Sequence, residues 1–248
     1  MKTIRQHLAN IVTLLNLFCG CLAITMVIQG QLHYAAFFVL AGAFFDFIDG
    51  LVARMLGIST SLGGELDSLS DVVTFGVVPG LILFSLLSQT YATTVNHSDT
   101  FVSLYSNFRY LFLAPAFLFT LAAGYRLGKF NVDTRQTKSF IGLPSPSAAL
   151  FVISLPLILE YSSFNALSSI ILNPWTLYGT TITGGLLMIA EWPLMGIKFQ
   201  HVKWQGNEYK YILIAGSVIA LIFLRFAGIP VAILFYLILS IIQNVQQK

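Results

Sequence analysis

Long apolar stretches alternate with short polar or Gly- and Pro-containing breaks along most of the chain. A helix needs about 20 mostly apolar residues to cross the roughly 30 Å hydrocarbon core of a membrane. Eight stretches reach or approach this length: 8–28, 33–56, 66–89, 108–128, 145–161, 175–196, 209–226 and 229–244. The pattern therefore predicts a bundle of transmembrane helices. Only Gly228 and Pro230 separate the last two stretches, so this pair could instead form a re-entrant unit.

Composition indicates the same class of protein. The chain is 56% hydrophobic and 9% charged, whereas about 25% of the residues of an ordinary soluble domain are charged. A water-soluble fold of this length could not bury so much apolar surface. We therefore predict an all-α, polytopic membrane protein. Its expected partners are membrane lipids, and binding of nucleic acid is not expected.

The basic residues predict the orientation of the helices. If the N-terminus is cytoplasmic, then of the 13 Lys and Arg only Arg109 and Arg225 fall on the outside. Cytoplasmic loops of membrane proteins carry an excess of Lys and Arg, so both termini are predicted to be cytoplasmic. A basic cytoplasmic face also suits anionic headgroups and phosphorylated substrates.

The few acidic residues are concentrated in one place. Five of the 10 lie in one short stretch, at the ends of the second and third predicted helices that face the cytoplasm. The stretch reads Asp46-x2-Asp49-Gly50-x2-Ala53-Arg54-x8-Gly63-x3-Asp67-x3-Asp71. Residues three, four or seven apart share one face of a helix. Asp46 and Asp49 thus form one stripe, Asp67 and Asp71 another, and a turn at about 57–63 would bring the stripes together.

This pattern predicts a metal site for phosphoryl chemistry. Carboxylates within a membrane protein are costly unless they are paired or bind a cation. With no His or Cys in the cluster, a hard cation such as Mg²⁺ or Mn²⁺ is favoured over zinc. Two ions shared by aspartates suit displacement at phosphorus, because they offset the charge of a pyrophosphate. Arg54 at the rim can bind phosphate oxygens, and the small Gly50, Ala53 and Gly63 permit close approach.

A purely structural role explains only part of the pattern. An aspartate in the first turn of the third helix, where we expect Asp67, would stabilise the helix dipole. The same dipole disfavours Asp46 and Asp49 near the C-terminal end of the second helix. A functional role is therefore the better interpretation.

The chain resembles the CDP-alcohol phosphotransferase family. The acidic stretch matches the D-x2-D-G-x2-A-R-x8-G-x3-D-x3-D motif of that family at every fixed position and gap. The resemblance implies a membrane enzyme, usually homodimeric, in which an alcohol displaces CMP from a CDP-linked lipid. It implies a six-helix domain over 1–200, followed by a C-terminal helical pair over 201–248. The roles implied are metal binding by Asp46, Asp49, Asp67 and Asp71, general base catalysis by Asp71, and nucleotide or pyrophosphate contacts by Asp49, Gly50, Arg54 and Gly63.

Two other parts of the chain bear on the acceptor alcohol. Residues 10–20, and 125–131 with 140–149, resemble the integral-membrane phosphatidylserine synthases of bacteria. This implies CDP-diacylglycerol and L-serine as substrates, at the cytoplasmic side of a bacterial inner membrane. One difference is Lys129, where that group commonly has Arg; the charge remains but the bidentate fork is lost. The candidate acceptor-binding residues are Arg126, Lys129, Asn131 and Ser145, although Arg126 and Lys129 could equally be anchors of the positive-inside kind.

Three alternatives remain open from the sequence. The same chemistry could use glycerol 3-phosphate or inositol phosphate, but a phosphorylated acceptor calls for several Arg in its pocket. An intramembrane prenyltransferase would carry its aspartate motifs on separate helix pairs. A cation transporter gives no reason for Gly50, Arg54 and Gly63 at these intervals. Serine-dependent release of CMP distinguishes all three from the preferred function.

Overall fold

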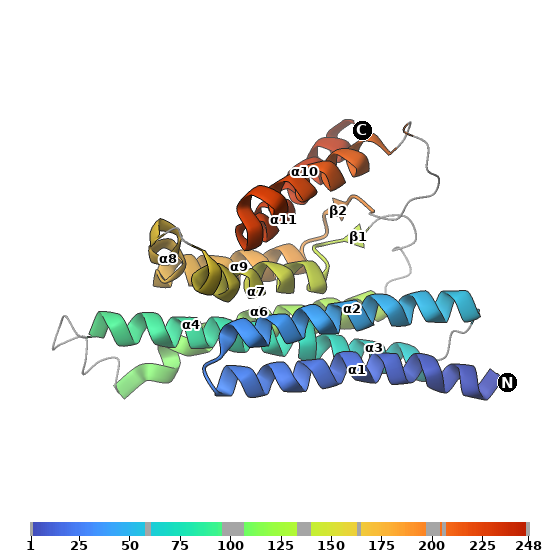
Figure 1. The fold of residues 1–248 in the computed structure, drawn as a ribbon, viewed down its shortest axis with the longest axis horizontal. Helices are drawn as coiled ribbons and strands as arrows, with labels where there is room; N and C mark the ends of the chain where they lie inside the picture. The colour runs from blue at the N-terminus through green and yellow to red at the C-terminus, as the bar shows by residue number, and fades with distance from the viewer. Residues whose placement is uncertain are drawn as a thin grey trace.

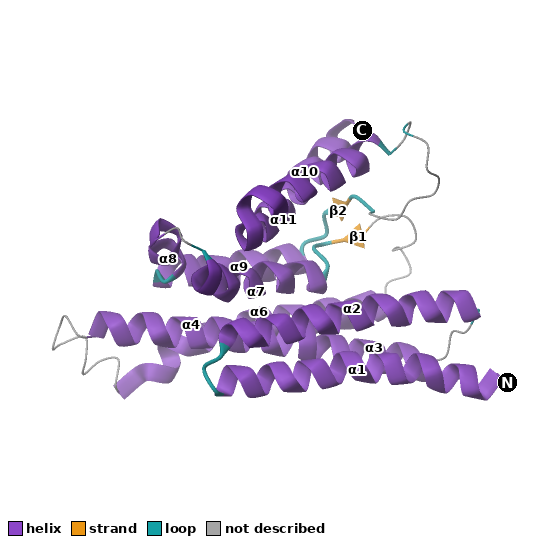
Figure 2. Ribbon diagram, in the orientation of Figure 1, coloured by secondary structure: helices purple, strands orange, loops and turns teal. Residues whose placement is uncertain are grey.

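A computed structural model describes residues 2–57, 61–95, 107–132, 140–162, 165–196, 204 and 207–246. These residues are almost entirely helical (Figure 2). The elements are α1 (Lys2–Ile28), α2 (Leu32–Leu56), α3 (Ser61–Asp71), the π-helix η1 (Val72–Val77), α4 (Val78–Val95), the 3₁₀ turn η2 (Ala114–Ala116), α6 (Phe117–Val132), β1 (Phe140–Ile141), α7 (Ser145–Tyr161), α8 (Asn165–Ile171), α9 (Pro174–Ile189), β2 (Pro193–Leu194), α10 (Glu208–Leu224), the 3₁₀ turn η3 (Arg225–Ala227) and α11 (Gly228–Gln246). Residues 107–113 are also helical and lead into η2.

The predicted class is confirmed. Within the described residues, five helical stretches are long and apolar enough to cross a membrane, and α7 is a shorter apolar helix. Helix occupies most of each of the eight predicted spans. The short helix α8 was not predicted, because seven residues are too few to show an apolar period.

The third helix begins earlier than the sequence pattern predicts. It starts at Ser61 and continues through α3, η1 and α4 without a break. Asp67 and Asp71 therefore lie in its second and third turns, and the prediction that they occupy the first turns is wrong. Because the helix dipole acts mainly within the first turn, it contributes little reason for an acid at either position.

The sixth predicted span, 175–196, is also corrected. Helix α9 ends at Ile189, and Pro193 disfavours helical backbone at the residue before it. The following residues are extended, and β2 pairs antiparallel with β1, with Phe140 opposite Leu194. This small strand pair joins the region after α9 to the turn before α7.

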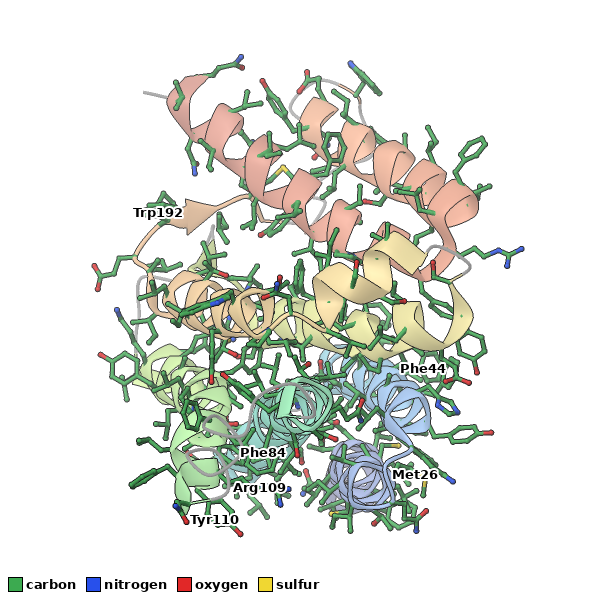
Figure 3. The ribbon with its side chains drawn as sticks, turned by 90° about the vertical axis from the view of Figure 1, so that its left-hand side faces the viewer. Met26, Phe44, Phe84, Arg109, Tyr110 and Trp192 are labelled. Carbon is green, nitrogen blue, oxygen red and sulfur yellow. The ribbon has the colours of Figure 1, made fainter. Side chains whose placement is uncertain are left out.

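The helix formed by α3, η1 and α4 lies at the centre of the bundle. It contacts α1, α2, α6, α7 and α9, and Figure 1 shows these helices running along it. In the view along the bundle, Phe84 of α4 lies between the helices that carry Met26 and Tyr110 (Figure 3). The fully buried side chains of this central helix include Phe75, Ile82, Leu83, Leu86 and Leu87. The predicted C-terminal pair, α10 and α11, pack on each other and meet the rest through α7 and β2.

Gly142 is required by the turn before α7. Its φ is +74°, and a Cβ there would lie 2.6 Å from the carbonyl oxygen of Met188 and 2.8 Å from that of Ala190. We expect Gly142→Ala to destabilise the protein by about 2–4 kcal/mol, because left-handed backbone disfavours a side chain and the turn is overpacked. The midpoint of thermal unfolding, measured for each variant in the same detergent, checks this expectation. Gly128→Ala is the control, since a Cβ there meets nothing within 4 Å among the described residues; equal midpoints for the two variants would contradict the expectation.

Candidate active site

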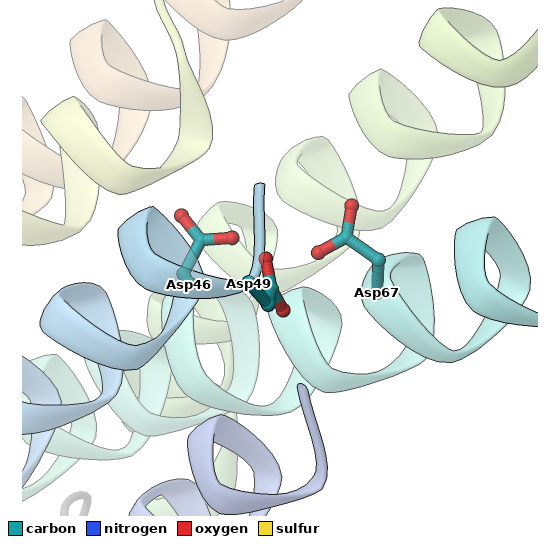
Figure 4. Close-up of side chains that lie close together, drawn as sticks. All are labelled: Asp46, Asp49 and Asp67. Atoms are coloured by element: carbon teal, nitrogen blue, oxygen red, sulfur yellow. The ribbon is translucent and has the colours of Figure 1, made fainter. Parts of the chain in front are cut away.

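Three of the four predicted aspartates converge between α2 and α3. One carboxylate oxygen from each of Asp46, Asp49 and Asp67 lies within 4.8 Å of the others. Figure 4 shows the three side chains close together, Asp46 and Asp49 on one helix and Asp67 on its neighbour. The αL conformation of Gly57 ends α2, and the short connection to Ser61 brings the helices side by side. The predicted convergence of the two stripes is confirmed for these residues.

The cluster has the properties of a site for a hard cation. Asp49 Oδ2 and Asp67 Oδ1 are buried and accept no hydrogen bond from the residues that the structure describes. Buried polar atoms are nearly always satisfied by a hydrogen bond or an ion. These two oxygens are therefore available to bind a cation. The cluster contains carboxylates only, which fits Mg²⁺ or Mn²⁺.

Asp71, the predicted general base, lies one turn after Asp67 on α3 and is buried. Its Oδ1 accepts a hydrogen bond from Asn16 Nδ2 on α1, at 3.2 Å. The π-helix η1 follows directly; such segments often occur at functional sites. Thr120 Oγ1 donates to the Gly76 carbonyl oxygen in η1 at 2.9 Å, and so supports the altered helix.

Helix α1 contributes polar side chains that the sequence analysis did not include in the site. Thr13 is hydrogen-bonded to the Asp49 carboxylate, and Asn16 to Asp71. In return, Ser70 Oγ donates to the Thr13 carbonyl oxygen at 3.3 Å and Thr74 Oγ1 to that of Asn16 at 3.2 Å. The signal was present in the sequence, because polar residues at spacings of three in an apolar helix share one face. What they face could not be read from the pattern.

Small residues let α1, α2 and η1 approach closely beside this network. A Cβ on Gly20 would lie 2.6 Å from Thr74 Oγ1, and one on Gly42 would lie 2.9 Å from Asn16 Oδ1. Glycine at helix contacts permits such close packing in membrane proteins. The side chain of Asn16 is fully buried, and this packing holds its amide in place.

Gly50 and Arg54 lie at the open side of the cluster. Arg54 Nε donates to the Gly50 carbonyl oxygen at 2.8 Å, and both residues retain exposure to solvent. Among the described residues, a Cβ on Gly50 would meet only Arg54 Nη2, at 3.9 Å. Packing within the described part of the chain therefore does not require glycine at this position. Close approach of a ligand is a reason for glycine there. Gly63 lies on α3, one turn before Asp67.

Two of the four acceptor-binding candidates meet in the structure. Arg126 on α6 is buried, and its Nη1 donates to Ser145 Oγ at the start of α7, at 3.0 Å. The guanidinium interacts electrostatically with Asp71. Its Nε is buried without an acceptor among the described residues. A buried cation next to the acidic cluster lowers the cost of burying both kinds of charge.

The other two candidates have partners elsewhere. Lys129 Nζ lies 2.6 Å from Glu191 Oε1, in an ion pair between α6 and the residues after α9. Asn131 Nδ2 donates to Ser68 Oγ at 2.8 Å. Both contacts are exposed. Lys129 and Asn131 therefore join structural elements at exposed positions, whereas Arg126 and Ser145 are buried.

The fold and the site define a class of protein: a polytopic bundle of membrane helices that holds a cluster of carboxylates between two adjacent helices. Comparison with protein families is more specific. The model described as CDP-alcohol phosphatidyltransferase matches residues 6–195, and the chain belongs to this family. The match extends from α1 to β2 and so includes all four aspartates and Arg126.

Relatives of known name support the assignment. A CDP-diacylglycerol–serine O-phosphatidyltransferase of Bacillus subtilis is 31% identical, over 82% of this chain and 95% of that protein. A protein of the same name from Helicobacter pylori strain J99 is 31% identical, over 94% of this chain and 89% of its own length. An archaetidylserine synthase of Methanothermobacter thermautotrophicus is 34% identical, over 64% of this chain and 61% of that protein.

Proposed function

We propose that this protein transfers a phosphatidyl group from CDP-diacylglycerol to the hydroxyl of L-serine, giving phosphatidylserine and CMP. The observation that carries the proposal is the cluster of Asp46, Asp49 and Asp67 at the positions of the family motif, with two buried oxygens that have no partner among the described residues. The names of the three relatives above all contain serine, which supports the choice of acceptor.

The aspartates have separate roles in this proposal. Asp46, Asp49 and Asp67 hold a divalent cation, Mg²⁺ or Mn²⁺, and Asp71 contributes to a second. When bound, these ions supply the positive charge that offsets the pyrophosphate and the departing CMP. Thr13 orients Asp49 through their hydrogen bond. Gly50 allows the nucleotide to approach the backbone of α2, Arg54 binds phosphate oxygens from the rim, and Gly63 allows close approach at the start of α3.

Asp71 acts as the general base. Asn16 holds its Oδ1, which leaves the second carboxylate oxygen to accept the proton of the serine hydroxyl. The serine oxygen then forms a bond to the lipid-side phosphorus, and the bond from this phosphorus to the oxygen of CMP breaks. CMP leaves with the electron pair of that bond. General base catalysis of this kind typically contributes about 10²–10⁴-fold to a rate.

Arg126 is the best candidate to bind the serine carboxylate. A guanidinium binds a carboxylate through charge-assisted hydrogen bonds, and its buried Nε has an unused donor within the described part of the chain. Ser145, hydrogen-bonded to Arg126, lies next to it. Lys129 and Asn131 are weaker candidates, because each already has a polar partner.

The setting of the reaction completes the proposal. We place the active site at the cytoplasmic face of a bacterial inner membrane, and the distribution of Lys and Arg supports the cytoplasmic side. A homodimer remains an expectation from the family resemblance. Family membership argues against the prenyltransferase and the transporter considered above, and leaves the other acceptors as competitors.

The decisive experiment measures CMP release by the purified full-length protein with CDP-diacylglycerol and Mg²⁺. We expect release to depend on L-serine, with phosphatidylserine identified as the lipid product by mass spectrometry. Glycerol 3-phosphate and inositol phosphate are tested in parallel at the same concentration. Release with either of them at a rate equal to that with serine would overturn the choice of acceptor while retaining the chemistry.

A further inference from the structure

Helix α11 is tied to the residues after α9 by a closed ring of hydrogen bonds. The Met195 N–H donates to Ser240 Oγ at 3.2 Å, and the Tyr236 hydroxyl donates to the Met195 carbonyl oxygen at 3.0 Å. The side chains of Tyr236 and Ser240 are hydrogen-bonded to each other. All three residues are buried, so water cannot easily replace a lost partner.

The segment held by α11 supports the turn before α7. Met195 directly follows β2, which pairs with β1. Beyond the strands, the Gly142 N–H donates to the Trp192 carbonyl oxygen at 3.0 Å, and the Leu143 N–H to that of Leu187 at 2.8 Å. A further bond, from Asn244 of α11 to the Pro193 carbonyl oxygen, strengthens the connection. These bonds connect the turn before α7 to α11 through the residues that follow α9.

The turn leads into the acceptor side of the site. Ser145 begins α7 two residues after Leu143, and its hydroxyl accepts the hydrogen bond from Arg126. Tyr236 also lies near enough to Arg126 for their charges to influence each other when the phenol ionises. A route through the strand pair therefore connects α11 to the guanidinium. By contrast, the packing partners of α11 are chiefly α10, α7 and β2, whereas the aspartates lie on α2 and α3.

We propose that Tyr236 and Ser240 are positioning residues for the acceptor half of the active site. By holding Met195, they fix the strand pair and the turn before α7, and so set Ser145 and Arg126 at the distance that serine needs. Serine as the acceptor rests on the proposed function. The inference gives the last helix pair, which lies beyond the family match, a role in selecting the alcohol.

Single-hydroxyl variants test this role in the full-length protein. Tyr236→Phe and Ser240→Ala each open the ring without removing bulk. We expect the KM for L-serine to rise about 5- to 20-fold, as for loss of a buried hydrogen bond. The kcat and the KM for CDP-diacylglycerol should stay within about twofold, because the aspartates are undisturbed. Backbone amides of residues 140–143 and 190–195 should exchange faster with deuterium in both variants.

Tyr178→Phe is the matched control. The Tyr178 hydroxyl on α9 also donates to a backbone carbonyl, that of Phe112, at 2.6 Å, and it lies 2.9 Å from the hydroxyl of Tyr91 near the end of α4. This variant should leave the serine KM unchanged. An unchanged serine KM in both Tyr236→Phe and Ser240→Ala, or a loss confined to kcat, would overturn the positioning role. If Tyr236→Phe does not fold, Ser240→Ala decides the question alone.

Failure of the proposed function is seen separately. It would appear as wild-type protein without serine-dependent CMP release. The exchange measurement needs no substrate and still reports whether α11 holds the turn. Unchanged exchange in both variants would overturn the inference, whatever the acceptor.

Discussion

Asp71→Asn is expected to lower the rate of CMP release by about 10³-fold, the middle of the range for loss of a general base. Asparagine has nearly the shape of aspartate, and its carbonyl oxygen can still accept the hydrogen bond from Asn16 Nδ2. The geometry of the site should therefore survive while the proton acceptor is lost. Single-turnover kinetics with CDP-diacylglycerol and saturating serine measures the chemical step directly.

Binding of the donor distinguishes this effect from a general disruption of the site. The affinity of Asp71→Asn for CDP-diacylglycerol, measured by titration, should remain close to that of the wild-type protein. Glu65→Gln is the control, since it makes the same change from acid to amide at an exposed position of the same helix, and it should keep full activity. Near-normal turnover in Asp71→Asn would exclude Asp71 as the base.

Asp67→Asn is expected to have opposite effects on activity and stability. Loss of an outer-shell partner of a metal typically lowers activity by up to about 100-fold. Asp67 is proposed to be a direct ligand, so turnover should fall by more than that. In the presence of a chelator, however, the variant should unfold at a temperature about 2–4 °C higher than the wild-type protein. The reason is repulsion: Asp67 lies with Asp46 and Asp49 inside one small cluster, and removal of one negative charge relieves it.

Adding Mg²⁺ then provides a readout that does not depend on activity. The cation binds the folded wild-type protein and should raise its unfolding midpoint in a concentration-dependent way. The midpoint of Asp67→Asn should respond much less, whereas that of Glu65→Gln should respond like the wild type. An equal Mg²⁺ response in Asp67→Asn and the wild-type protein would remove Asp67 from the metal site.

The structure shows how a network outside the motif can support these aspartates. Asn16 and Thr13 belong to α1, whereas the acids that they contact belong to α2 and α3. The close approach at Gly20 and Gly42 lets three helices meet at this point. Such a network holds carboxylates in one geometry although they repel one another, which is what preorganised catalysis requires.

The position of the acid cluster was predictable because its geometry is local. Asp46 and Asp49 share a face through helix periodicity alone, and a short turn brings Asp67 opposite them. Helix ends were less predictable. The start of α3 at Ser61 was missed because the residues before Leu66 are polar and Gly-rich. The end of α9 was missed because the residues after Ile189 include Trp192 and remain largely apolar despite Glu191, so the pattern shows no clear stop.

Contacts between distant parts of the chain were not predictable. The pairs Asn16–Asp71, Arg126–Ser145 and Lys129–Glu191 each join different helices. From the sequence, Arg126 and Lys129 are equivalent basic residues at one helix end. The structure separates them, because the backbone of α6 turns Arg126 into the bundle and Lys129 towards the exposed Glu191.

By itself, the sequence determined the membrane class, the helices and the acidic motif, because apolar length and helical spacing depend on neighbouring residues. Only the tertiary structure decided which side chains contact the acids, which of the two basic residues on α6 is buried and which residues α11 contacts. These depend on how helices far apart in the chain pack together, and many arrangements of eight apolar helices satisfy the same local pattern. Only that packing shows that one oxygen of Asp49 and one of Asp67 are buried with no partner in the described part of the chain.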